Sequence, residues 1–392
     1  MKKIRKITYL LFITLLFVSC TMKESNKTND DTLNDSIISM GEMYMLVGTY
    51  TSAEGSKGIY VYKIDTDTGE SEKVSMVDVA NPSYLVISPN EKFVYSVGID
   101  EKNGYAHSFS FDKESGNLTL LNSQLTVGSG PTYIALDAKG NNVITANYGG
   151  GSISQFNVNS DGTLSPLSNL FQFEGKGTDP KRQQQPHLHS VRYSPDGSFL
   201  FAADLGTDKV YRYKTVQSVF EGQPALLKND TAVFMTPEGT GPRHFDFHPN
   251  GLYFYLLGEL SGEVIVYDYN MGDLQQKQRI LADTVGARGS ADIHVSPNGR
   301  FLYASNRLQE DGIAVFAIDS QDGTLTKIGY QLTGKHPRNF AITPNGKFLL
   351  VASRDDNVIQ VFAIDKKTGM LQDTKQDIFI DKPVCIKFTR LN

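Results

Sequence analysis

Arginines, histidines and acidic residues recur at matched positions between residues 187 and 354 of this 392-residue chain. Arginine guanidinium groups bind carboxylates and phosphates through paired hydrogen bonds. Histidine and glutamate side chains can move protons during a reaction. The residues concerned are His187, His189, Asp204, Arg243, His244, Glu259, Arg307, His336, Arg338 and Arg354. Together they could form a site for a small anionic ligand, with groups for acid–base chemistry, if the fold brings them together.

A repeated turn motif indicates which elements position these residues. A short apolar run is followed by a Ser-Pro-Asn-Gly-like turn and a second apolar run, a pattern typical of antiparallel strands. The copies lie at Ser88–Asn90, Ser194–Gly197, His248–Gly251, Ser296–Gly299 and Thr343–Gly346, with a weaker one at Asp137–Gly140. A third strand, an Asp-x-x-x-Gly turn and a fourth strand complete the unit. Because no segment has a sustained helical period, the sequence predicts an all-β fold.

The spacing of the repeats predicts a propeller. The residue at the start of each leading strand serves as an anchor, and successive anchors lie 46 to 57 residues apart: Pro82, Pro131, Leu188, Pro242, Ser290, Pro337 and Pro383. Seven four-stranded units of this length predict a seven-bladed β-propeller. Because only one strand follows Pro383, three strands between Tyr44 and Val79 are expected to complete the last blade. That blade should pair Tyr44–Tyr50 with Val384–Thr389.

The propeller arrangement predicts that the residues named above converge. In each blade the first strand leads away from one mouth of the channel and the second returns to it. Residues one and about seventeen positions after an anchor therefore share that mouth, where His187, His189, Arg243, His244, Glu259, Arg307, His336, Arg338 and Arg354 should gather. Insertions at 175–185 and 215–230 are expected to line the working face. The excess of arginine favours a small anionic ligand, and charged side chains that only line a wet channel are the alternative.

Composition excludes several classes of protein. Hydrophobic residues make up 40% of the chain and charged residues 21%, which is enough to form a folded core. A net charge of −5 offers no electrostatic basis for nucleic-acid binding. The only cysteines, Cys20 and Cys385, exclude a disulfide scaffold and a zinc–cysteine site. Cys385 is expected to pack in the core. Arginines beside the histidines would repel a metal ion, so neither a metal nor a cofactor is expected.

The N-terminal segment predicts export. Four basic residues precede an apolar run over residues 7–18, which is too short to span a bilayer. The run leads into Ser19 and Cys20, and the whole resembles a bacterial lipoprotein signal. The resemblance implies that residues 1–19 are removed and that diacylated Cys20 holds the protein on the periplasmic or cell-surface side of a membrane. Ordinary secretion is the alternative. Residues 20–42 lack aromatic side chains and predict a flexible tether to a domain over residues 43–392.

Several segments resemble the lactonase family of seven-bladed propellers, which includes cycloisomerase-type 6-phosphogluconolactonases and the fungal carboxy-cis,cis-muconate lactonising enzyme. These segments are Val47–Thr51, Pro186–Ser190, Ala203–Asp208, Gly241–His244, Ser305–Arg307 and His336–Phe340, together with Glu259. The resemblance covers about residues 43–392. It implies that Arg243, Glu259 and Arg307 are catalytic, with either His187 or His189, of which the repeat position favours His189. The residues then expected to bind substrate are His187, Asp204, His244, Arg338 and Arg354.

The resemblance also implies a reaction, the metal-independent hydrolysis of a sugar lactone such as 6-phosphogluconolactone. Glu259 or His189 would be the base, Arg243 would stabilise the oxyanion, and the other member of the Glu/His pair would be the acid. A phosphorylated lactone is scarce outside the inner membrane, so the predicted export leaves the substrate open. The alternatives are a muconate-type cycloisomerase and a non-enzymatic surface propeller that binds anionic sugars or partner proteins. The protein is expected to act as a monomer.

Overall fold

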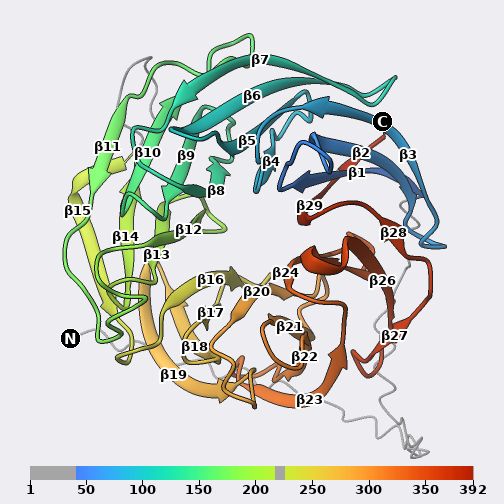
Figure 1. The fold of residues 1–392 in the computed structure, drawn as a ribbon. Coiled ribbons are helices and arrows are strands. Elements are labelled where there is room, and N and C mark those ends of the chain that lie inside the picture. Colours follow the sequence, from blue (N-terminus) through green and yellow to red (C-terminus); the bar gives the residue numbers. More distant parts are fainter. Residues whose placement is uncertain (1–40, 217–225, 392) are drawn as a thin grey trace, which may run out of the picture. The chain divides into compact units, whose positions relative to one another are not determined.

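The computed structural model describes residues 41–216 and 226–391, whose strands form seven antiparallel sheets arranged in a ring (Figure 1). The prediction of an all-β seven-bladed propeller is therefore confirmed. From the inner to the outer strand, the first two blades are β4 (Leu85–Ile87), β5 (Phe93–Ile99), β6 (Gly104–Asp112), β7 (Asn117–Leu125), and β8 (Pro131–Leu136), β9 (Asn142–Asn147), β10 (Ser152–Asn157), β11 (Asn169–Gln172). The next two are β12 (Leu188–Tyr193), β13 (Phe199–Asp204), β14 (Lys209–Thr215), β15 (Leu226–Met235), and β16 (Pro242–Phe247), β17 (Tyr253–Gly258), β18 (Glu263–Asn270), β19 (Asp273–Leu281). The fifth and sixth are β20 (Ser290–Val295), β21 (Phe301–Asn306), β22 (Gly312–Ile318), β23 (Leu325–Leu332), and β24 (Pro337–Ile342), β25 (Phe348–Ser353), β26 (Val358–Ile364), β27 (Leu371–Asp373), with β28 (Ile378–Phe379) also pairing with β26.

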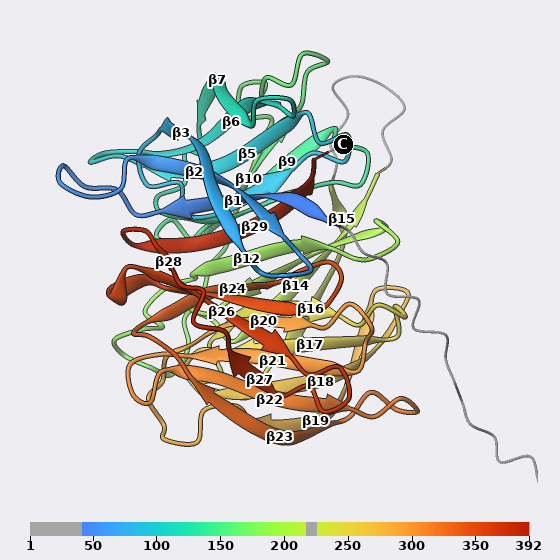
Figure 2. The ribbon, with the colours of Figure 1, turned by 90° about the vertical axis from the view of Figure 1, so that its right-hand side faces the viewer.

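The seventh blade joins the two ends of the domain. Its order is β29 (Pro383–Arg390), β1 (Glu42–Thr49), β2 (Gly58–Asp65) and β3 (Ser71–Asp78). Val47 lies opposite Ile386 in the β1–β29 ladder, and Figure 2 shows these two strands side by side. The predicted closure is confirmed, and its effect is that the first and last blades leave no unpaired edge between them.

Burial along the strands follows from their place in the blade. Both faces of a middle strand such as β21 or β25 pack against neighbouring blades, and every residue of these two strands is buried. Such strands read as continuous apolar runs. The outer strand β19, with the sequence DLQQKQRIL, instead alternates between partly buried and exposed side chains. The core therefore lies between blades, and the inner strands are left to line the channel (Figure 1).

The repeated turn joins the first strand of a blade to the second. In the copy at Ser194–Gly197, the Ser194 hydroxyl donates to Asp196 and accepts the N–H of Phe199. Gly197 has a φ of 69°, in the left-handed region that glycine adopts at little cost. The first copy has Glu91 at this place with a φ of 56°, so the turn keeps its shape there without glycine.

Two details differ from the sequence prediction. The strand β4 begins three residues after Pro82, because Asn81 has a φ of 49° and its carbonyl accepts the N–H of Ser83, which forms a turn there. A short 3₁₀ helix, η1 (Arg354–Asp356), follows β25. Cys385 is buried, as expected, and pairs with no cysteine among the described residues. Among the described residues, no helix is long and apolar enough to cross a membrane. The predicted signal, Cys20, the tether up to residue 40 and part of the 215–230 insertion lie outside the described residues.

Candidate active site

The candidate site lies at the mouth of the channel where inner strands begin and second strands end. Arg243 is the second residue of β16, and Glu259 directly follows β17. These strands pair Pro242 with Gly258, and the N–H of Glu259 donates to the carbonyl of Gly241 at 2.8 Å. The expectation that residues one and seventeen positions after an anchor share one mouth therefore holds in this blade.

Glu259 lies at the centre of an arginine cluster. Its Oε2 accepts from Nε of Arg243 at 2.8 Å and lies 3.3 Å from Nη2 of Arg307. Its Oε1 accepts from Nη2 of Arg182 at 2.6 Å. Arg243 is only 1% exposed, and Glu259 and Arg307 are also buried. Three guanidinium groups thus share one carboxylate, so the cluster carries an excess of positive charge.

The electrostatic environment keeps the Glu259 carboxylate ionised. Burial alone would raise its pKa, but the coulombic effects of Arg307, Arg243 and Arg182 outweigh burial and lower the pKa to about 2. A carboxylate with so low a pKa has little tendency to take a proton near neutral pH. Glu259 is therefore suited to hold the guanidinium groups in place and poorly suited to act as a general base.

His189 and His244 lie beside this cluster as neutral imidazoles. Their ring centroids are 5.2 Å apart, and both rings are buried. Burial, followed by the nearby charge of Arg243, lowers the pKa of His189 well below 6.5 and that of His244 to about 3. Nδ1 of His189 and Nε2 of His244 are buried and have no hydrogen-bond partner among the described residues. Nδ1 of His244 lies 2.7 Å from Oδ1 of Asp292, which fixes that ring.

The remaining arginines extend the cluster towards the next blades. Nη1 of Arg307 lies 3.1 Å from Nε2 of His336, and Nη2 of Arg354 lies 3.2 Å from Nδ1 of the same ring. Arg354 also pairs with its exposed neighbour Asp355. Arg338 lies over the ring of Tyr50, 5.6 Å from its centroid, and has no carboxylate partner among the described residues. Arg338 is therefore the cation of this mouth that is most available to an anion.

Comparisons with known proteins identify the family of this chain. The family described as lactonase, 7-bladed beta-propeller, matches residues 44–388. The chain belongs to the lactonase family. A 6-phosphogluconolactonase from Formosa agariphila is 39% identical over 86% of this chain and 97% of its own length. The corresponding protein of Bacillus subtilis is 37% identical over 87% and 97%.

Solved structures give the same assignment to the lactonase family. A Bacteroides fragilis protein described as a candidate 6-phosphogluconolactonase is 50% identical, with a TM-score of 0.86 and coverage of 89% of this chain and 98% of that one. A periplasmic gluconolactonase from Pseudomonas aeruginosa is 33% identical, with a TM-score of 0.83 and coverage of 90% and 100%. The family resemblance found in the sequence is thereby confirmed.

Two of the predicted substrate-binding residues of this lactonase-family chain lie apart from the arginine cluster. Asp204 is fully buried, and its oxygens accept from the N–H groups of His187 and Gly206 and from the Thr207 hydroxyl. It braces its own turn, so the expectation that it meets substrate is not supported by its contacts. His187 stacks on Tyr148 at 4.3 Å between ring centroids and contacts the Tyr148 carbonyl through Nδ1.

Arg182 belongs to the arginine cluster around Glu259 but was not identified from the sequence. It lies in the insertion at 175–185 and reaches both Glu259 and the hydroxyl of Tyr148. The sequence signal was the insertion itself, which was expected to line the working face, but no repeat position singles out this residue. Within residues 41–216 and 226–391, no group of three or more His, Cys, Asp or Glu side chains is placed to hold a metal ion.

Proposed function

We propose that this lactonase-family protein hydrolyses a sugar lactone in a 6-phosphogluconolactonase-like reaction that needs no metal ion. The observation that carries the proposal is the cluster of three arginines around Glu259, two of them buried, beside two neutral histidines. Hydrolysis of a lactone requires a base for water, donors for the tetrahedral oxyanion and an acid for the leaving oxygen. The two relatives named 6-phosphogluconolactonase support this substrate class.

Arg243 is the proposed donor to the oxyanion. Its Nε donates to Glu259 and its Nη1 to the carbonyl of Ala291. Its Nη2 has no partner within the described chain and can donate to the negative oxygen that forms during attack. Because Glu259 and Ala291 fix the guanidinium before substrate arrives, little reorganisation is needed in the transition state.

His189 is the proposed base for water. The imidazole is neutral at physiological pH, because burial and the nearby arginines hold the pKa of His189 well below 6.5, so the ring nitrogen that carries no hydrogen can accept a proton. Nδ1 of His189 has no hydrogen-bond partner among the described residues, whereas guanidinium groups engage both carboxylate oxygens of Glu259, so we favour the histidine as the base. Once protonated, His189 can return the proton to the ring oxygen as the lactone opens, which leaves an alcohol and a carboxylic acid that then releases its proton to solvent.

Substrate turnover tests the proposal. A pH-stat measurement on phosphorylated and free sugar lactones should show enzyme-dependent acid release for at least one of them. Hydrolysis in ¹⁸O-labelled water should place one labelled oxygen in the acid, whereas a cycloisomerase would incorporate none. Binding of every lactone without turnover would support the non-enzymatic alternative and overturn the proposal.

Arg338 is proposed to hold the anionic group of the substrate. We expect Arg338→Ala to raise KM about tenfold for phosphorylated or carboxylated lactones, with little change in kcat, because it removes an interaction present before and during reaction. Steady-state kinetics on a phosphorylated lactone and its free counterpart measure the effect. An equal rise in KM for both lactones would contradict this role.

We also propose that the enzyme is an exported lipoprotein anchored through Cys20. The N-terminal pattern supports this, and the Pseudomonas aeruginosa relative is described as periplasmic. We expect Cys20→Ser to abolish incorporation of labelled palmitate and to release the protein from the membrane fraction. The matched control is Cys385→Ser, which changes a buried cysteine and should leave labelling intact. If the wild-type protein takes up no label, the lipidation proposal is wrong, and ordinary secretion becomes the preferred explanation of the N-terminal pattern.

A further inference from the structure

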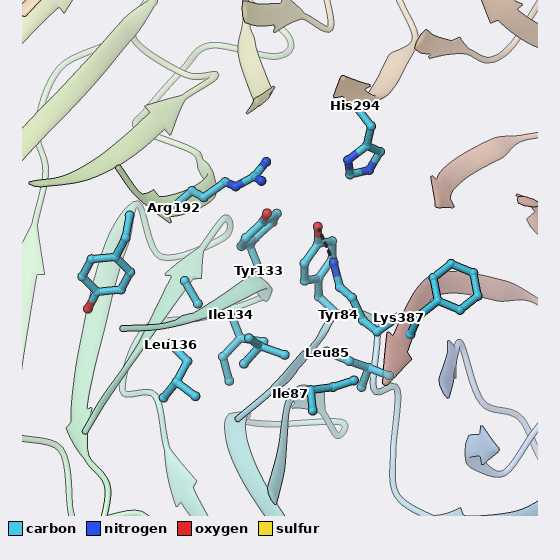
Figure 3. A pocket seen from close by; sticks show the side chains of 13 residues that line it. Tyr84, Leu85, Ile87, Tyr133, Ile134, Leu136, Arg192, His294 and Lys387 are labelled. Atoms are coloured by element: carbon cyan, nitrogen blue, oxygen red, sulfur yellow. Dashed lines mark hydrogen bonds between the residues drawn. The ribbon is translucent and has the colours of Figure 1, made fainter. Parts of the chain in front are cut away.

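A cavity of about 420 Å³ lies in the channel beyond the candidate active site. Its polar lining comes from Tyr84, Tyr133, Arg192, His294 and Lys387, which surround one space in Figure 3. Arg192, His294 and Lys387 are each the fifth residue of an inner strand. At the mouth that holds the candidate active site, Arg243 and Arg338 are each the second residue of an inner strand. At 3.3 Å per residue, the two levels are about 10 Å apart along the channel.

Side chains at the third position of the inner strands form a belt between these two levels. Oδ1 of Asp292 pairs with Nδ1 of His244, and Oδ2 accepts from the side-chain amide of Asn339. Tyr84 stacks on Tyr133 at 3.9 Å between ring centroids, and the edge of Tyr133 meets His244 at 5.3 Å. Because of this belt, the cavity is lined by residues other than those of the arginine cluster around Glu259.

The cavity exposes nitrogen donors and keeps the carboxylates behind them. The side chain of Arg192 is 38% exposed and that of His294 is 22% exposed. Their partners Asp246 and Asp292 are only 8% and 1% exposed. An anion that enters therefore meets N–H donors first, while the acidic groups are covered.

Lys387 supplies the one cation of this lining that has no carboxylate partner among the described residues. Its Nζ lies 3.4 Å from the Tyr84 hydroxyl and 4.5 Å from the centroid of the same ring (Figure 3). Arg192 uses Nη1 for Asp246, at 2.7 Å, and for the carbonyl of Phe245, and its Nη2 has no hydrogen-bond partner in the described chain. One unpaired positive charge in a cavity that also contains a free guanidinium nitrogen suits a single carboxylate.

We propose that this cavity is a second ligand site, which binds a small hydroxylated monocarboxylate. Lys387 would hold the carboxylate, and the free Arg192 nitrogen and the hydroxyls of Tyr84 and Tyr133 would meet the hydroxyl groups. A volume near 420 Å³ falls within the range of small-molecule sites. If the proposed lactone hydrolysis is correct and the lactone is not phosphorylated, its sugar-acid product has this chemistry, and the cavity would be a non-catalytic product site.

The test measures binding by calorimetry and locates the ligand in soaked crystals. The probes are sodium gluconate, neutral glucose, acetate and inorganic phosphate, each titrated into the whole propeller. Gluconate is expected to bind beside Lys387. Lys387→Gln should weaken that binding at least about tenfold, the usual effect of losing a charged hydrogen bond. Lys387→Arg should retain it. The matched control is Lys102→Gln, an exposed lysine in the loop after β5, which should change nothing.

Each other outcome overturns the proposal. Equal binding of glucose and gluconate would exclude charge recognition, and equal binding of acetate would exclude recognition of hydroxyls. Tighter binding of phosphate would contradict the monoanion preference. Turnover of the best lactone by Lys387→Gln should match that of the wild type, and a fall in kcat would show that the cavity belongs to the active site. Because binding is measured without turnover, the experiment would still test this second site if the lactonase proposal failed.

Discussion

Arg243→Ala is expected to lower kcat for the best lactone by about 10²–10³, the usual cost of losing an oxyanion donor. The side chain is almost completely buried, and two of its nitrogens are fixed by Glu259 and the Ala291 carbonyl. KM should change less than kcat, since the interaction forms fully only in the transition state. Steady-state kinetics, expressed per folded enzyme after a circular-dichroism melt, measure the effect.

Two further variants make this result specific. Arg243→Lys keeps a positive charge but loses the planar fork, so it should recover only part of the activity. Arg279→Ala is the matched control, because this arginine pairs with Glu263 on the outer surface of the same blade and should keep wild-type kcat. Near-native turnover by Arg243→Ala would remove the oxyanion role and leave the arginine as a structural partner of Glu259.

The fold could be predicted well from the sequence because local sequence signals specify each blade of a propeller and recur from blade to blade. Each unit carries its own turn chemistry, as Ser194–Gly197 shows, and the single strand after Pro383 required N-terminal strands to complete the ring. The same regularity placed Arg243 and Glu259 at one mouth, because their positions are set by strand pairing and not by long loops.

Contacts that depend on irregular segments or on side-chain direction could not be predicted in this way. Arg182 comes from an insertion whose path no repeat position fixes. Asp204 lies at the correct end of its strand, but its carboxylate turns inward to accept two backbone N–H groups. The number of arginines around Glu259 also decides its chemistry, and a residue list alone does not show that three of them contact one carboxylate.

Glu259→Gln is expected to lower the free energy of unfolding by about 3 kcal/mol at pH 7, from the difference between an ordinary pKa of 4.5 and about 2 in the folded protein. A depressed pKa stabilises the folded state above the unfolded pKa, and this contribution is lost as pH falls. The difference between wild type and variant should therefore be constant above about pH 5 and should shrink as pH falls from about 4.5 to about 2. Urea unfolding at stepwise lower pH measures it.

The same variant separates an electrostatic role for Glu259 from a role as base. If Glu259 only holds Arg243, Arg307 and Arg182, Glu259→Gln should lower kcat through their displacement but keep the shape of the pH–rate profile between pH 5 and 8. Glu263→Gln, which breaks a surface pair of the same blade, is the matched control and should change neither stability nor rate appreciably. Loss of an ionisation from the wild-type profile in Glu259→Gln would identify the carboxylate as the base. Its environment argues against that result, since a base surrounded by three guanidinium groups must give up their attraction whenever it takes a proton.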